Sequence, residues 1–143
     1  MMRNIVFLIV LVFSSVIGSA QNNTLTVNIT GISDIKGDIY IYLYTSEKGF
    51  PIEISKANKF KKVKVSKKSL SVSFKDITYG TYAVSVYHDI DANGKINQNF
   101  LGIPKEPVGV SNNAEGFMGP PKYEDAKFSL KSNKLITINL ENQ

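Results

Sequence analysis

The sequence predicts an all-β fold: a two-sheet antiparallel sandwich of about seven strands with one long ordered loop. Short segments in which apolar and polar residues alternate recur along the chain, and glycine- and asparagine-containing turns separate them. Beyond the N-terminal segment, no stretch keeps a helical period over three turns. Because each sheet then has one apolar face to bury, two sheets packed face to face are the expected solution.

The first two expected strands are residues 24–30 and 38–44. In 24–30, Leu25, Val27 and Ile29 alternate with polar residues, which places one face in a core. In 38–44, aliphatic residues occupy one face and three tyrosines occupy the other: Tyr40, Tyr42 and Tyr44. Their spacing of about 7 Å suits stacking on sugar rings. We favour the alternative, in which lysine side-chain stems or the long loop cover the tyrosines.

Lysine dominates residues 56–68. The seven lysines are Lys56, Lys59, Lys61, Lys62, Lys64, Lys67 and Lys68. They suit an anionic surface, such as lipid headgroups or acidic polysaccharide. The interpretation that we favour is an edge strand, in which lysine blocks pairing with another sheet. Nucleic acid is not an expected partner, because the chain is expected to be exported and the segment has no interleaved aromatic stacking platform.

Four further segments complete the expected strands. Residues 70–74 and 82–88 alternate again. Residues 126–130 and 135–140 flank Ser132-Asn133, which predicts a closing hairpin.

Between these strands lies the long loop, the 34 residues from Asp89 to Lys122, which contain no convincing strand. A segment of this length in a compact domain is either functional or contains structure that the sequence pattern does not reveal. Its apolar side chains are too many to leave in water, so we expect the loop to fold back as a packed cap over one end of the sandwich. They are Phe100, Leu101, Ile103, Val108, Phe117 and Met118.

The N-terminus has the pattern of a signal peptide over residues 1–20. Arg3 precedes a short apolar run from Ile5 to Phe13, and Gly18 and Ala20 occupy the positions that a signal peptidase inspects. The run is shorter than the roughly 20 apolar residues that a membrane-spanning helix needs. We therefore expect cleavage after Ala20 and a protein that is exported, periplasmic or secreted, and not transmembrane after cleavage.

Removal of 20 of the 143 residues leaves 123, which predicts a single domain over residues 21–143. Loss of Arg3 lowers the formal charge from +5 to +4. The chain has no cysteine, so packing or a bound ion must stabilise it instead of disulfides. The absence of cysteine from an exported chain favours a protein of the bacterial envelope.

Residues 89–97 carry the most specific chemical pattern. Acidic or amide side chains stand at positions one, three, five and nine, with a glycine at six and a backbone carbonyl available at seven. The candidate ligands are Asp89, Asp91, Asn93, Lys95 and Asn97. Ca²⁺ takes several oxygen ligands, and this spacing wraps a short loop around one ion. The cofactor expected here is therefore Ca²⁺.

The calcium pattern is incomplete. Position twelve, where a bidentate glutamate belongs, is Phe100. A carboxylate from elsewhere must complete the shell, and Glu106, Glu124 and Asp125 are candidates. The alternative is a plain turn whose Asp and Asn side chains bond their own backbone.

His88 is the only histidine, and it precedes Asp89. A His-Asp pair with Ser111 would suggest hydrolysis, but the surrounding sequence lacks the second glycine of a nucleophile elbow. Adjacent strand residues also point to opposite faces. We expect a hydrogen-bonded structural histidine and no catalytic residue. Zinc is disfavoured, because one histidine and no cysteine leave only oxygen ligands.

Several segments together resemble the bacterial family called domain of unknown function 2141. They are Gly80–Asp89, Asp91, Asn93–Lys95, Asn99–Glu106, Ser111–Asn113, Gly119–Pro121 and Glu124–Ala126, with Gly49–Pro51 as a weaker mark. The resemblance implies an exported bacterial β-sandwich, and it brings no established activity. The family often has aspartate where this chain has Asn97. A looser likeness to transthyretin-like and carboxypeptidase regulatory-like sandwiches implies a supporting or binding role, and we expect an Ig-like or transthyretin-like sandwich.

These observations favour a non-enzymatic binding or structural module of the bacterial envelope, with an envelope protein or a glycan as partner. We expect the domain to be monomeric. The alternative is a small hydrolase that acts on envelope glycans or esters, using Glu106, Glu124 or Asp125 near His88.

Overall fold

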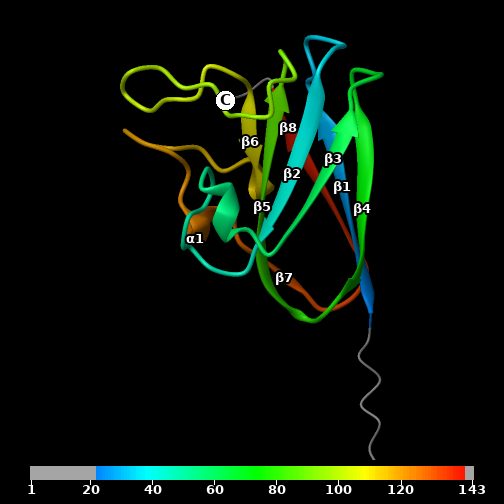
Figure 1. Cartoon of the computed structure of the whole chain (residues 1–143). Helices are drawn as coiled ribbons and strands as arrows, with labels where there is room; N and C mark the ends of the chain where they lie inside the picture. Colours follow the sequence, from blue (N-terminus) through cyan, green and yellow to red (C-terminus); the bar gives the residue numbers. More distant parts are fainter. Residues whose placement is uncertain (1–21, 141–143) are drawn as a thin grey trace, which may run out of the picture.

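A computed structural model of the chain describes residues 22–140 and confirms the all-β sandwich (Figure 1). The described strands are β1 (Asn23–Thr30), β2 (Asp38–Tyr44), β3 (Lys59–Lys64), β4 (Leu70–Ile77), β5 (Gly80–Asp89), β6 (Val108–Val110), β7 (Phe128–Leu130) and β8 (Lys134–Asn139). One sheet has the order β4-β1-β8; the other has the order β3-β2-β5-β6, with β7 also paired to β5. The expected signal peptide lies outside the described residues. Within 22–140, no helix is long and apolar enough to cross a bilayer.

Strand β1 lies at the centre of the smaller sheet. Its residues alternate between buried and half-buried, and Leu25, Val27 and Ile29 are all 0% exposed, as the period of two predicts. β1 pairs antiparallel with β4 and parallel with β8. Every other pairing between the described strands is antiparallel.

The closing hairpin predicted around Ser132-Asn133 is wrong. β7 pairs with β5 in the larger sheet, whereas β8 pairs with β1 in the smaller one, so the intervening residues cross between the sheets. The Asn133 side chain fixes the crossing by accepting a hydrogen bond from the Thr24 backbone N–H at 2.8 Å. Alternation reveals which face of a strand is apolar, but it does not identify the strand that pairs with it.

The tyrosines of β2 are covered, which confirms the interpretation that we favoured. Tyr42 is 5% exposed and Tyr44 is 0% exposed. They lie on the outer face of the larger sheet with Tyr87, and Phe50, Ile96, Val108 and Tyr123 pack against this cluster. Side chains from the β2–β3 connection, the long loop and α1 thus cover these tyrosines on the outer face. Tyr40 and Phe60 extend the row of aromatic rings towards solvent.

The lysine-rich segment forms β3, the edge strand of the larger sheet, as the edge-strand interpretation predicts. All of its residues except Val63 are exposed. Lys62 contacts the Asp38 carboxylate at 3.0 Å and lies 5.2 Å from the centre of the Tyr40 ring.

The long loop contains more regular structure than the sequence predicted. β6 pairs with β5, and a 3-10 turn, η2 (Ser111–Asn113), follows it directly. A short helix, α1 (Tyr123–Ala126), comes just after the loop. β6 was missed because it is three residues long with a central glycine. A Cβ on Gly109 would lie 2.8 Å from Cγ2 of Ile138, so the glycine permits close packing.

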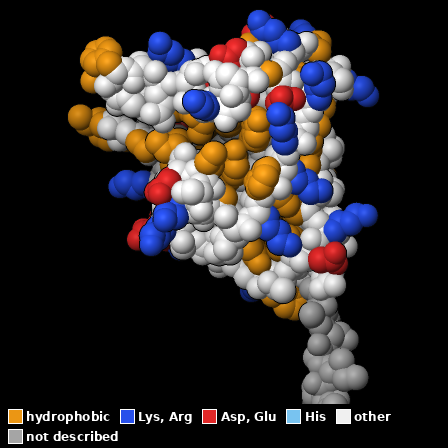
Figure 2. All heavy atoms as spheres, in the orientation of Figure 1, with side chains coloured by type: hydrophobic (Ala, Val, Ile, Leu, Met, Phe, Trp, Pro, Cys, Tyr) orange, Lys and Arg blue, Asp and Glu red, His pale blue; other side chains and the backbone are white. Residues whose placement is uncertain are grey.

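The expectation that the loop buries its apolar side chains is wrong. Val108 is half-buried, but the other five are exposed: Phe100 94%, Leu101 68%, Ile103 55%, Phe117 92% and Met118 94%. The loop covers the outer face of the larger sheet, and two of its segments project from the body (Figure 1). Hydrophobic side chains stand at these extremities in Figure 2. The backbone of these segments turns back within a few residues, so their side chains lie too far from the sheet to pack on it.

Candidate metal site

Asp89 ends β5 and is 0% exposed. It shares the outer face of the larger sheet with Tyr87, while His88 shares the inner face with Val86, because successive strand residues alternate. The residues that follow, 89–97, form what we call the acidic turn.

The acidic turn is organised by side chains that accept hydrogen bonds from its own backbone. The Asp89 carboxylate accepts from the N–H groups of Asn93 at 3.1 Å and Gly94 at 2.8 Å. Asp91 also accepts from Asn93 N–H, and the Asn93 side chain accepts from Lys95 N–H at 2.7 Å. These are the bonds of the plain-turn alternative, and they fold residues 89–95 into a closed loop.

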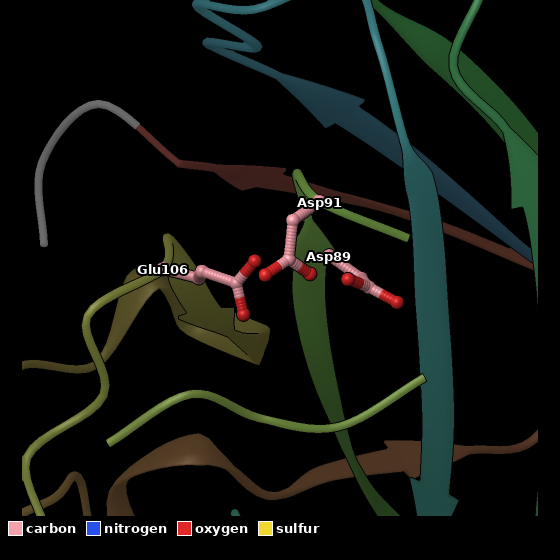
Figure 3. A group of neighbouring side chains, drawn as sticks. All are labelled: Asp89, Asp91 and Glu106. Atoms are coloured by element: carbon pink, nitrogen blue, oxygen red, sulfur yellow. The ribbon is translucent and has the colours of Figure 1, made fainter. Parts of the chain in front are cut away.

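Glu106 is the carboxylate that joins this turn from outside it. Its oxygens accept from the backbone N–H groups of Ile90 at 2.9 Å and Asn97 at 3.3 Å. Carboxylate oxygens of Asp89, Asp91 and Glu106 lie within 4.8 Å of one another (Figure 3). The other two sequence candidates, Glu124 and Asp125, are exposed on α1 and do not belong to this group.

The two asparagines also converge on Asp91. Asn93 Nδ2 donates to Asp91 Oδ2 at 2.9 Å and to Asn97 Oδ1 at 3.0 Å, and Asn97 Nδ2 donates to Asp91 Oδ2 at 2.9 Å. A half-rotation of each amide about its terminal bond would point oxygen, instead of nitrogen, towards Asp91. The backbone carbonyl of Lys95 accepts from the Tyr87 hydroxyl. The structure thus brings the side chains of four predicted residues, Asp89, Asp91, Asn93 and Asn97, into one network.

Among the described residues, no cationic side chain pairs with this acidic group. None of the ion pairs formed within residues 22–140 involves Asp89, Asp91 or Glu106. Desolvation acts to raise the pKa of Asp91, but hydrogen bonds from Asn97, Asn93 and Asp89 outweigh it and hold that pKa below its usual value. Burial, and then the charges of Tyr40 and Asp89, raise the pKa of Tyr42 to about 12.

With this geometry established, the relationship to known proteins is clear. Residues 27–138 match the bacterial family described as "Uncharacterized protein conserved in bacteria (DUF2141)". The chain belongs to this family. The match confirms the resemblance drawn from the sequence motifs, and it assigns no activity. No curated protein and no solved structure matches the chain.

Within this DUF2141 chain, His88 and Ser111 do not form a catalytic pair. His88 is fully buried, and its Nε2 lies 2.8 Å from the Lys36 carbonyl oxygen. Its Nδ1 has no partner among the described residues. The Ser111 hydroxyl accepts from Val84 N–H at 2.9 Å and donates to the Ala126 carbonyl at 2.6 Å. Each residue is therefore engaged with backbone, as the sequence suggested for the histidine.

The DUF2141 motif Ser111-Asn112-Asn113 forms a structural clasp, a role that the sequence analysis missed. Asn112 donates from Nδ2 to the carbonyls of Asp125 and Lys127, both at 3.0 Å. Asn113 accepts from Asn139 N–H at 2.9 Å. Asn112 and Asn113 have φ of 62° and 47°, and asparagine tolerates this left-handed region. Two asparagines after a serine in a turn were the available signal.

Proposed function

We propose that this protein is an exported, non-enzymatic binding or structural module of the bacterial envelope, and that its acidic turn binds Ca²⁺. One observation carries the calcium proposal: Asp89, Asp91 and Glu106 gather carboxylate oxygens within 4.8 Å and make no ion pair within the described residues. Three like charges this close repel one another, and a divalent cation would remove that repulsion.

The chemistry of the donor set supports calcium over other metals. Ca²⁺ takes six to eight oxygens in flexible geometry, and this group offers three carboxylates. After amide rotation, Asn93 and Asn97 would add side-chain oxygens, and Lys95 adds its carbonyl. Zinc remains disfavoured, because the chain has no cysteine and its one histidine faces the opposite side of the sheet. Affinity is expected to be about micromolar or weaker, as in sensor and extracellular sites.

The contacts of the candidate catalytic groups support a non-enzymatic role. Ser111 and the Nε2 atom of His88 are engaged with backbone, and Glu124 is paired with Lys127 on the exposed helix α1. No observation favours the hydrolase alternative.

Thermal melting in calcium and in chelator tests the metal proposal. At 100-fold over the dissociation constant, a site in the folded state adds about 2.7 kcal/mol to the unfolding free energy. Glu106→Gln should abolish this gain. Asp125→Asn, which removes an exposed carboxylate outside the group, should retain it. Equal melting of the wild-type protein in calcium and in chelator would contradict the proposal.

Mass spectrometry tests the export proposal. Protein recovered from a bacterial envelope fraction should begin at Gln21, because cleavage is expected after Ala20. Recovery of an intact chain that begins at Met1 would contradict it.

A further inference from the structure

We propose that two apolar loop tips dock this protein onto the surface of an anionic lipid bilayer. The first tip comprises residues 98–105 and the second comprises residues 115–121. The inference rests on the proposed function only in that export brings the protein to the envelope, where such surfaces occur.

The tips expose apolar side chains to an extent that is unusual for a soluble domain. Phe100 and Met118 are 94% exposed and Phe117 is 92% exposed. Grouped apolar side chains of this kind mark protein or membrane interaction sites. Met118 also has a φ of 56°, a left-handed conformation that is uncommon for a non-glycine residue and more often found at functional sites.

Four backbone N–H groups of the first tip, those of Asn99, Leu101, Gly102 and Ile103, are paired within the tip. The Asn99 side-chain oxygen accepts from Leu101 N–H at 2.9 Å and from Ile103 N–H at 3.0 Å. Gly102 N–H donates to the Asn99 carbonyl, and Asn99 N–H donates to the Ile103 carbonyl. An unpaired backbone group is costly in an apolar phase. Pairing of these four N–H groups lowers the cost of moving the tip out of water.

The two tips flank a single groove, so one surface can contact both. The groove has a volume of about 1080 Å³ and is lined by apolar residues from both tips and from the body, among them Ile52, Ile103, Val108, Met118 and Leu140. Both tips project from the same side of the sandwich (Figures 1 and 2). A protein partner would need a preformed pocket for each protruding side chain. A bilayer interface accepts them at any lateral position.

Charge favours an anionic bilayer. Residues 22–140 contain 16 lysines and 11 acidic residues, a net charge of +5, after Arg3 and Glu141 are subtracted from the totals for the chain. Exposed Lys105 lies in the first tip and exposed Lys122 follows the second, against one exposed acidic residue, Glu115, in the second tip. Lysines near a membrane are attracted by anionic headgroups. Calcium in the acidic turn would also offset the negative charge of the three carboxylates next to the first tip.

Tryptophan fluorescence provides a direct test, because the chain has no tryptophan. Phe117→Trp places a reporter on the second tip. Phe60→Trp is the matched control: Phe60 is 64% exposed, but it lies on β3, at the edge of the larger sheet opposite β6 and the tips (Figure 1). Each protein is titrated with vesicles of phosphatidylcholine and phosphatidylglycerol, with vesicles of phosphatidylcholine alone, and with or without calcium.

On the mixed vesicles, emission of Phe117→Trp should shift to the blue while emission of Phe60→Trp stays constant. Binding should weaken on phosphatidylcholine alone and at high salt. Co-sedimentation of a Phe117→Ser, Met118→Asn double variant should show affinity reduced about tenfold or more, since two apolar side chains no longer leave water. Asparagine suits the left-handed position, so the fold is preserved. Phe60→Ser should bind as the wild type does.

An unchanged Phe117→Trp spectrum on mixed vesicles at low salt would overturn bilayer docking. A shift of Phe60→Trp alone would overturn it as well, because the lysine edge would then be the contact. The calcium arms separate the two proposals. Vesicle binding that is equal with and without calcium supports docking and shows that docking does not require calcium. Calcium-dependent melting without vesicle binding supports only the metal site.

Discussion

The clasp and the second tip stand two residues apart, yet they use their side chains in opposite ways. In the clasp, Ser111 is 0% exposed, and the hydroxyl and both asparagine side chains bond to backbone of β5, α1 and β8 or to residues beside them. In the second tip, Phe117 is 92% exposed. Hydrogen bonding of side chains to neighbouring backbone thus separates the residues that build this loop from those available for contact.

The largest expected effect is a loss of stability on substitution of Gly37, which extends the comparison to a closely packed glycine and a glycine in an exposed tip. A Cβ there would lie 2.0 Å from the Asp89 carbonyl oxygen, where backbone meets backbone, and its φ is +72°. Gly37→Ala should lower the unfolding free energy by more than about 3 kcal/mol in chemical denaturation. Gly102→Ala, in the first tip, has a similar φ of +78° but open space, so only backbone strain of about 1 kcal/mol is expected. Equal losses at the two glycines would contradict the distinction.

Ser111→Ala should have the next largest effect. It leaves the buried Val84 N–H and Ala126 carbonyl without their shared partner, which should cost about 2 to 3 kcal/mol in urea unfolding. Phe117→Ser is the matched substitution in the second tip, and it should change stability by no more than about 0.5 kcal/mol. If the tip variant proved the more destabilising, the assignment of building and contact roles would be reversed.

Alkaline pH should destabilise the protein through the covered tyrosines. Burial raises the pKa of Tyr42 from 10.0 to about 12, and it also raises the pKa of Tyr44 and Tyr87. The stabilising contribution is therefore complete below pH 10 and is lost as pH rises through the folded-state value. For Tyr42 alone the loss is on the order of 2 kcal/mol. Unfolding free energies measured against pH should show this decline, and Tyr42→Phe should reduce it.

The smallest expected effect is a loss of stability at acidic pH, which arises from Asp91 in the acidic turn. The pKa of Asp91 is held below 3.8, so its contribution is present above that pH and is lost as pH falls through the lower folded-state value. Melting temperatures followed from neutral pH to below pH 3.8 should fall less steeply for Asp91→Asn than for the wild type. An identical pH profile in both proteins would show that the turn does not depend on this charge.

The sequence predicted the parts of the fold that local chemistry determines. Alternation in 24–30 located β1 and its buried face, and alternation across His88 and Asp89 placed the two side chains on opposite faces. Alternation cannot specify which distant strand becomes a neighbour. The parallel pairing of β1 with β8 and the separation of β7 from β8 were therefore not predicted.

The candidate site shows the same division. The spacing of Asp89, Asp91, Asn93 and Asn97 identified the turn, because those residues interact within a few positions of one another. The selection of Glu106 over Glu124 and Asp125 depends on how the long loop folds back against β5, which no local pattern encodes. The exposed tips were mispredicted for a related reason: apolar content indicates burial only where a segment can reach the sheet.

The parallel pairing of β1 with β8 also constrains when the protein can fold. β1 is the middle strand of its sheet, and its partner on one side is more than a hundred residues further along the chain, from Leu25 to Lys134. A nascent chain that emerges N-terminus first therefore holds an apolar strand with one open edge until β8 appears. Contacts of such long sequence separation form slowly. The smaller sheet can therefore be completed only after every strand of the larger sheet has been synthesised.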